Sequence, residues 1–189
     1  CDMMEKKVLK AGEPMNVVVP TGNFGNILAA YYAKRMGVPI GKLICASNAN
    51  NVLTDFLKTG TYDKNRPFYM TTSPSMDILI SSNLERLLFH LSGEDDARIR
   101  DWMAELNQTG TYTVSKELKE NITALFAAGC ADDTETAASI RETFEQDHYL
   151  SDTHTGVAIR VYREYRKATG DKTPTIIAST ASPYKFPKS

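Results

Sequence analysis

Apolar positions in the first fifty residues form two short β-branched blocks with a helical pattern between them. The blocks Met15 to Pro20 and Lys42 to Ala46 are rich in Val, Ile and Leu, which predicts two strands. Between them, Phe24 to Met36 repeats apolar residues at spacings of three and four, and Gly37 followed by Pro39 predicts the end of this helix. A strand, helix, strand unit of this kind predicts a parallel sheet.

Helical patterns dominate the middle of the chain. Apolar residues spaced by three and four, with polar caps before them, predict helices over residues 52–58, 81–91, 94–107, 115–126 and about 132–146. Residues 59–75 are punctuated by Gly and Pro and predict a loop with one short strand. The pattern closes with a predicted helix over His154 to Ala168 and a predicted strand over Thr175 to Ser179.

Together these elements predict an α/β fold in which helices flank a parallel sheet. We expect residues 1–58 to form the first strand, helix, strand part, residues 59–151 to form a mostly helical insertion, and residues 152–189 to add a closing helix and strand. The chain begins with Cys1 rather than Met, and residues 1–11 resemble the tail of an earlier helix. We therefore expect the chain to be a fragment of a longer protein.

Composition and charge narrow the possible function classes. With 42% hydrophobic and 24% charged residues, the 189-residue chain is typical of ordinary globular proteins and not of disordered or disulfide-rich ones. Its 22 basic and 23 acidic residues give a net charge of -1, which supplies no overall field for nucleic acid or an anionic membrane. Any anion must therefore be bound by a local site.

Cysteine and histidine residues indicate neither disulfides nor a metal site. The three cysteines form no CxxC pair, and no apolar run reaches the roughly 20 residues needed to cross a bilayer, which favours reduced thiols and a cytoplasmic location. The three histidines are scattered and form no HExxH motif. We interpret Asp152 and His154 as the cap and first turn of the last helix.

The turn at residues 21–26 (TGNFGN) joins the first strand to the first helix. Free backbone N–H groups and the positive end of the helix dipole converge at such a turn, so it favours an anion, and phosphate is the natural ligand. Gly22 and Gly25 permit close approach to the backbone, while Asn23 and Asn26 add amide donors. The string matches neither GxGxxG nor GxxxxGK[ST], and a plain tight turn with a cap explains it equally well.

A second polar cluster, residues 178–183, ends the last predicted strand. Ligands of open α/β sheets bind at the carboxyl ends of parallel strands, so this hydroxyl-rich segment and the turn at 21–26 could face one ligand. Small residues that end a strand before a proline give the same pattern without any ligand.

Four strings in order along the chain resemble the threonine synthases, a family of fold type II pyridoxal-phosphate enzymes. Residues 19–26 (VPTGNFGN) look like the family's loop for the cofactor phosphate, and residues 73–86 (SPSMDILISSNLER) look like its central signature. Residues 152–155 (DTHT) are similar to its Asp-Pro-His-Thr segment, and residues 179–186 (STASPYKF) are similar to its terminal Thr-Ala-His-Pro-x-Lys-Phe segment.

This resemblance implies a site for pyridoxal 5'-phosphate (PLP). Its phosphate would be held by the backbone amides of Gly22, Asn23, Phe24, Gly25 and Asn26, and its pyridine nitrogen would face the hydroxyl of Thr180. The implied enzyme is a lyase of threonine biosynthesis that converts O-phospho-L-homoserine and water to L-threonine and phosphate. The family's cofactor lysine lies in an upstream Ser-Phe-Lys-Asp type segment that these residues do not contain, and Lys185 is not its counterpart. We therefore predict that this chain alone is inactive and binds PLP weakly or not at all.

Several positions depart from the family pattern. Ser182 stands where the family usually has His, Asn51 stands where Asp is common, and Thr153 replaces the proline before the histidine. The string Ser81 to Arg86 identifies the family without a chemical role, and we interpret it as a capped helix with Glu85 and Arg86 exposed or paired.

Two other functions agree with the same residues. One is another fold type II lyase of the threonine dehydratase or cysteine synthase type. The other is a non-catalytic phosphate-binding module that never had the lysine. If the chain is a fragment, its incomplete sheet would expose an edge and apolar surface meant for missing parts, so self-association of the chain is expected.

Overall fold

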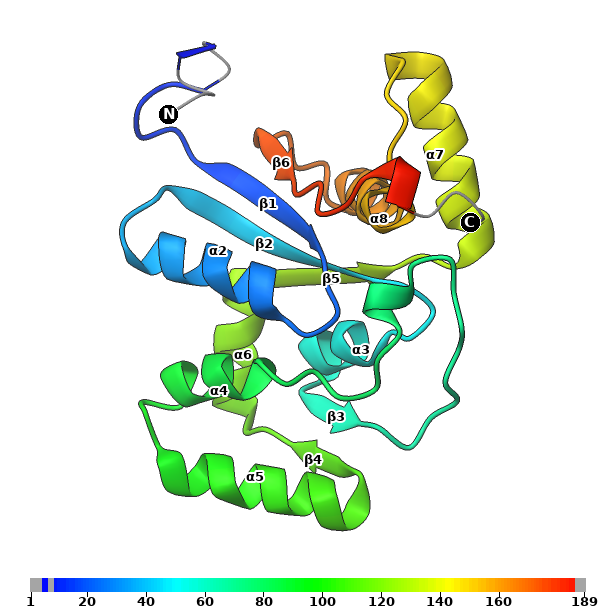
Figure 1. Ribbon diagram of the computed structural model, residues 1–189. Helices are drawn as coiled ribbons and strands as arrows, with labels where there is room; N and C mark the ends of the chain where they lie inside the picture. Colours follow the sequence, from blue (N-terminus) through cyan, green and yellow to red (C-terminus); the bar gives the residue numbers. More distant parts are fainter. Residues whose placement is uncertain (1–4, 7–8, 186–189) are drawn as a thin grey trace.

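A four-stranded parallel sheet lies between two layers of helices in the computed structural model, which describes residues 5–6 and 9–185 (Figure 1). Its strands, in the spatial order β5-β2-β1-β6, are Phe126–Cys130, Ile40–Ser47, Met15–Pro20 and Thr175–Ile177. The predicted α/β fold with a flanked parallel sheet is confirmed. Most of the helix tail expected over residues 1–11 lies outside the described residues.

Alternation along β1 and β2 explains the two layers. Val19 and Leu43 are buried on one face of the sheet, where they pack with α2 (Gly25–Arg35). Val18 and Ile44 point to the other face and pack with α8 (Thr153–Thr169). Because successive strand residues face opposite sides, two consecutive apolar residues in each strand require cover on both sides.

The remaining elements lie beside and below this sheet in Figure 1. They are α3 (Val52–Thr59), β3 (Thr61–Asp63), η1 (Pro74–Met76), α4 (Leu84–Leu91), α5 (Asp96–Thr109), β4 (Thr111–Thr113), α6 (Lys116–Leu125), α7 (Asp133–Asp147) and η2 (Pro183–Lys185). The short antiparallel pair β3 and β4 stacks the rings of Tyr62 and Tyr112 with centroids 5.4 Å apart. This ring pair anchors α5 through Trp102, whose ring lies 6.1 Å from Tyr112.

Strand β5 was not predicted from the sequence. It lies inside the range 59–151, which we expected to be a mostly helical insertion, and it pairs with β2 from Leu43 to Ser47. Its residues Ala127, Ala128 and Gly129 are poor strand formers, and β5 begins directly where α6 ends. Small residues are needed there because a Cβ on Gly129 would lie 2.9 Å from Val161 of α8.

Within the described residues, no helix is long and apolar enough to cross a membrane.

Candidate functional site

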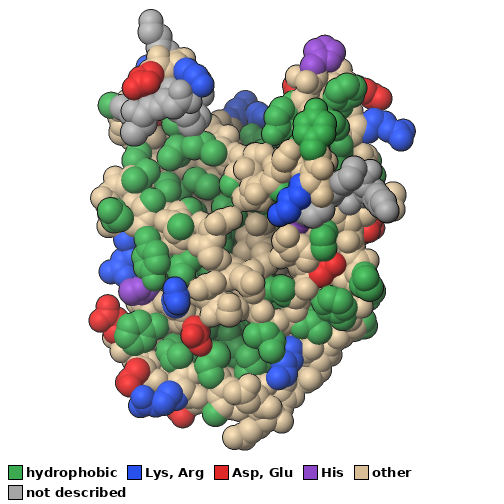
Figure 2. All heavy atoms as spheres, viewed as in Figure 1, with side chains coloured by type: hydrophobic (Ala, Val, Ile, Leu, Met, Phe, Trp, Pro, Cys, Tyr) green, Lys and Arg blue, Asp and Glu red, His purple; other side chains and the backbone are tan. Residues whose placement is uncertain are grey.

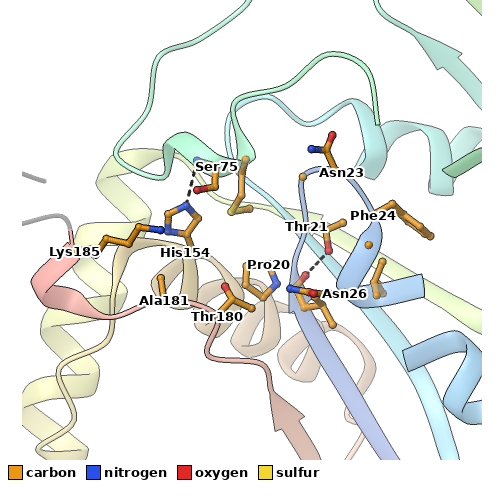
Figure 3. Close-up of a pocket in the computed structure, with 15 residues that line it drawn as sticks. Pro20, Thr21, Asn23, Phe24, Asn26, Ser75, His154, Thr180, Ala181 and Lys185 are labelled. Atoms are coloured by element: carbon orange, nitrogen blue, oxygen red, sulfur yellow. Dashed lines mark hydrogen bonds between the residues drawn. The ribbon is translucent and has the colours of Figure 1, made fainter. Parts of the chain in front are cut away.

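A pocket of about 320 Å³ opens at the carboxyl end of β1, between the turn after β1 and the segment after β6 (Figure 3). The six residues predicted for the cofactor all line it, together with side chains that the sequence did not single out for it. The full lining is Val19, Pro20, Thr21, Gly22, Asn23, Phe24, Gly25, Asn26, Ile27, Ser75, Met76, His154, Thr180, Ala181 and Lys185. Two strand ends thus meet at one cavity, as the position of ligands in parallel sheets suggests.

The N-terminus of α2 is open toward this pocket. Its N-cap residue, Phe24, has a left-handed backbone with φ 62°, makes no side-chain cap, and is followed by no acidic residue in the first turn. The Phe24 ring is only 1% exposed and lies 5.8 Å from the ring of Phe126 in the core. Phe24 therefore offers the pocket its backbone alone, and the helix end presents N–H groups and the positive end of a dipole.

Gly22 is required by a close approach within the turn. A Cβ at this position would lie 2.7 Å from the carbonyl oxygen of Ser75, which no real Cβ tolerates. A Cβ on Gly25 would meet only Asn83 Nδ2 at 3.7 Å, an ordinary contact. The two glycines of the turn thus differ, because only Gly22 is fixed by packing.

The polar side chains of the turn point in different directions. The amide of Asn26 lies on the side of Thr180, whereas Asn23 projects from the far end of the turn (Figure 3). The hydroxyl of Thr21 donates to the carbonyl of Val19 at 2.7 Å and is therefore occupied within the strand end. Asn26 and Thr180 are both exposed and available to a ligand.

Charged side chains contribute little to the face of the molecule shown in Figure 2. Its centre consists mainly of backbone and uncharged side chains, with Lys, Arg, Asp and Glu toward its rim. Among the described residues that line the pocket, Lys185 is the one Lys or Arg, so an anion at this site would be held chiefly by backbone N–H groups, hydroxyls and amides, with Lys185 as a nearby positive charge.

His154 forms the opposite wall of the pocket and is 4% exposed. Its Nε2 accepts a hydrogen bond from the backbone N–H of Ser75 at 3.3 Å, and its Nδ1 lies 3.3 Å from Oδ1 of Asp152. Burial lowers the pKa of His154 and outweighs the opposing effect of the Asp152 carboxylate. Lys185 extends toward the imidazole (Figure 3) and lowers the same pKa further. A neutral imidazole that accepts at Nε2 follows from this arrangement.

The predicted cap at Asp152 is confirmed. Its buried carboxylate accepts hydrogen bonds from the N–H groups of His154 at 2.9 Å and Thr155 at 3.2 Å, and from the Thr155 hydroxyl at 2.5 Å. The backbone N–H groups in the first turn of α8 therefore have their acceptor in the side chain of the N-cap residue, Asp152.

The loop before α4 is attached to the sheet by a polar network around Asp77. The Asp77 carboxylate accepts from Asn48 Nδ2 at 2.7 Å, from Asn50 Nδ2 at 3.1 Å and from the Thr71 hydroxyl at 2.7 Å. A polar cap was expected before the predicted helix 52–58. The N-cap residue of α3, Asn51, makes no side-chain cap, and its side-chain oxygen instead accepts a hydrogen bond from Arg66 at 2.9 Å. Asn48 and Asn50 hold the loop, because their side-chain amides donate to the Asp77 carboxylate.

The string Ser81 to Arg86 also differs from its expected role. Asn83 precedes α4 but makes no side-chain cap; its Nδ2 donates to the carbonyl of Asn23 at 2.8 Å. Ser81 donates its hydroxyl to the carbonyl of Gly22 at 2.9 Å. Glu85 and Arg86 are exposed, as expected. The expected side-chain cap was therefore wrong, because the side-chain amide of Asn83 reaches the turn after β1 and does not cap α4.

No cluster of metal-ligating side chains occurs in the part of the chain that the structure describes. Ser182 is exposed and lies outside the pocket lining, so the family position that it occupies contributes no side chain to the cavity.

No protein-family model matches the chain. Human "threonine synthase-like 1" is 44% identical over 187 residues, which is 98% of this chain and 25% of the human protein. The threonine synthase of Saccharomyces cerevisiae is 39% identical over 191 residues, covering 94% of this chain and 37% of the yeast enzyme. The crystal structure of the PLP-bound threonine synthase from Brucella melitensis superposes with a TM-score of 0.91 at 42% identity, and the match covers 98% of this chain and 39% of that one. The chain thus spans about a quarter to two fifths of the length of these relatives.

Proposed function

We propose that this chain, which is similar to threonine synthases over about a quarter to two fifths of their length, forms the cofactor-phosphate site of a PLP-dependent lyase of that family. The reaction is the conversion of O-phospho-L-homoserine and water to L-threonine and phosphate. The observation that carries the proposal is the open N-terminus of α2, which lies in a pocket and makes no side-chain cap. It is the feature expected where a phosphate group supplies the missing negative charge.

The residues of the pocket fit PLP. The turn at Gly22, Asn23, Phe24, Gly25 and Asn26 would hold the phosphate by its backbone amides. The Thr180 hydroxyl, on the opposite wall, would contact the pyridine nitrogen. A hydroxyl does not enforce a fully protonated ring, which an aspartate at the same place would do.

PLP supplies an electron sink for charge that develops on the substrate's Cα. The described residues have a different task, because they fix where the phosphate end lies. The turn would orient the phosphate by hydrogen bonds. His154 holds Ser75 close to Gly22, because its Nε2 accepts a hydrogen bond from the backbone N–H of Ser75. We assign no proton transfer to His154, since Ser75 already occupies its Nε2.

The test uses the intact natural protein. We expect it to bind PLP with a visible absorbance band and to release phosphate and L-threonine from O-phospho-L-homoserine. Serine and threonine serve as competing substrates, because a dehydratase or a cysteine synthase type enzyme would not require the γ-phosphate. A protein that binds PLP but acts only on serine or threonine would contradict the proposed substrate. One that binds phosphate but forms no absorbing PLP complex would favour the non-catalytic module.

The 189-residue chain alone is expected to be inactive, because it contains no counterpart of the family's cofactor lysine. Turnover of O-phospho-L-homoserine by the isolated chain would contradict this expectation. We also propose self-association of the isolated chain, a cytoplasmic location, and the division at residues 58 and 151. Strand β5 falls within the middle part of that division, residues 59–151, although it pairs with β2 of the first part.

A further inference from the structure

The turn that lines the pocket is held from its outer side by two side chains. Ser81 donates its hydroxyl to the carbonyl of Gly22 at 2.9 Å, and Asn83 donates its amide to the carbonyl of Asn23 at 2.8 Å. The backbone N–H of Asn83 also lies 3.3 Å from the same Asn23 oxygen. Two consecutive carbonyl groups of the turn are thus fixed by one short segment.

Fixing a carbonyl also fixes the N–H of the next residue. The peptide unit is planar and trans, so the C=O of one residue and the N–H of the next point in opposite directions. The carbonyls of Gly22 and Asn23 face Ser81 and Asn83, and the N–H groups of Asn23 and Phe24 therefore face away from that segment. Asn23 and Phe24 line the pocket, whereas the described residues that line it do not include Ser81 or Asn83.

The segment that carries these two donors is itself rigidly attached. The backbone N–H of Ser81 donates to the Tyr62 hydroxyl at 2.9 Å, and that hydroxyl donates to the carbonyl of Leu79 at 3.0 Å. Burial raises the pKa of Tyr62 to about 12, so the phenol keeps its proton at neutral pH. The Asp77 network holds the preceding residues to the end of β2. Ser81 is 7% exposed, so water competes little for its hydroxyl.

We propose that Ser81 and Asn83 are positioning residues for the phosphate group: they orient the turn so that the N–H groups of Asn23 and Phe24 point into the pocket. This inference rests on the proposed function and adds to it two residues that do not line the pocket. The exposed Glu85 and Arg86 of the same string make no comparable contact with the turn in the described structure.

The experiment compares binding of inorganic phosphate and of PLP to the intact natural protein and its variants by calorimetry. Ser81→Ala and Asn83→Ala each remove one donor, and we expect each to weaken both affinities roughly three- to tenfold, the worth of one hydrogen bond. Ser82→Ala is the matched control, because Ser82 is exposed beside them, and its affinities should equal those of the unsubstituted protein. Asn83→Asp keeps the size of the side chain without its donor and should behave like Asn83→Ala or worse.

A second readout separates positioning from a general loss of stability. The ³¹P chemical shift of PLP bound at saturation reports the surroundings of the phosphate, and we expect it to change in Ser81→Ala and Asn83→Ala and to return in Ser81→Thr, which keeps the hydroxyl. Unchanged affinities and an unchanged shift in folded Ala variants would overturn the positioning role while leaving the proposed function intact. If the unsubstituted protein binds neither phosphate nor PLP, both proposals fail together.

Discussion

Two helices begin at the pocket, α2 and α8, and their N-termini are completed in opposite ways. At α8, the carboxylate of Asp152 takes the hydrogen bonds of the first turn. At α2, the cap residue is Phe24, whose ring is buried in the core and cannot accept a hydrogen bond. The difference teaches that a helix end whose cap residue offers no side-chain acceptor keeps its first N–H groups open to another acceptor, which is one condition for binding an anion.

The absence of a side-chain cap does not make an anion site by itself. Helices α3 and α4 also lack a side-chain cap. At α3, the side chain of Asn51 donates to Cys130 and accepts from Arg66. At α4, the side chain of Asn83 donates to the turn after β1. What distinguishes α2 is the combination of an open end, a turn fixed by Gly22 and a cavity in front of it.

The largest effect is expected from removing the side-chain cap of α8. Asp152→Ala removes a buried cap and leaves the N–H groups of His154 and Thr155 without their acceptor, which should lower the free energy of unfolding by about 2–4 kcal/mol. Urea denaturation measures it. Asp95→Ala, at the more exposed cap of α5, is the control and should cost only about 1 kcal/mol. Equal losses in the two variants would show that burial of the Asp152 cap adds nothing.

The next largest effect concerns the turn at the open end. Gly22→Ala forces a Cβ against Ser75, so we expect a loss of about 1–3 kcal/mol in the free energy of unfolding and weaker phosphate binding. Gly25→Ala is the same chemical change three residues away, where the Cβ has room. It should leave stability unchanged or raise it by about 0.4–1 kcal/mol. The geometry of the turn would be wrong if Gly22→Ala were tolerated as well as Gly25→Ala.

A smaller effect is expected from placing an acidic side chain at the N-terminus of α2. Asn26→Asp places a carboxylate in the first turn of α2, where the helix dipole should stabilise the fold by about 0.3–1 kcal/mol. The same charge repels phosphate, so stability and phosphate affinity should move in opposite directions. Thermal unfolding and phosphate calorimetry measure the two quantities, and Asn26→Ala controls for loss of the amide. A gain in both quantities would refute the comparison between the two helix ends.

The smallest effect is a pH dependence of the free energy of unfolding that comes from His154 at the N-terminus of α8. Burial lowers the pKa of His154 in the folded state, so the unfolded chain takes up a proton first as the pH falls. His154 should therefore leave stability unaffected above a pH of about 6.5 and reduce it as the pH falls from there toward the lowered pKa. Urea titrations at pH 7.5 and 5.5 should show a smaller acid-induced loss in His154→Gln, which keeps an acceptor for Ser75. An identical loss in both proteins would exclude His154 as its source.

Sequence patterns located the frame of the site well. The strand-end pattern indicated that the turn at 21–26 and the segment 178–183 could face one ligand, and the family resemblance alone singled out Thr180. Both segments line one pocket because β1 and β6 are neighbours in the sheet. The cap at Asp152 was equally readable, since an Asp before a helical pattern has few other uses.

What the sequence could not provide was the position of the loop between β3 and α4. Ser75 reaches the pocket because Asp77 binds Asn48 and Asn50, which lie almost 30 residues earlier. Such contacts between polar side chains leave no periodic signal. The same reason hid the contacts of Ser81 and Asn83 with the turn, although the string around them already resembles the threonine synthases.

The pairing of β1 with β6 also sets when the pocket can exist. Asn16, in β1, binds Asp171, which follows it by 155 residues. At the usual rate of protein synthesis the ribosome needs roughly 8–30 s to cover that interval. During this time one wall of the cavity has been made and the other has not, so a nascent chain cannot enclose a ligand until translation has passed Lys185.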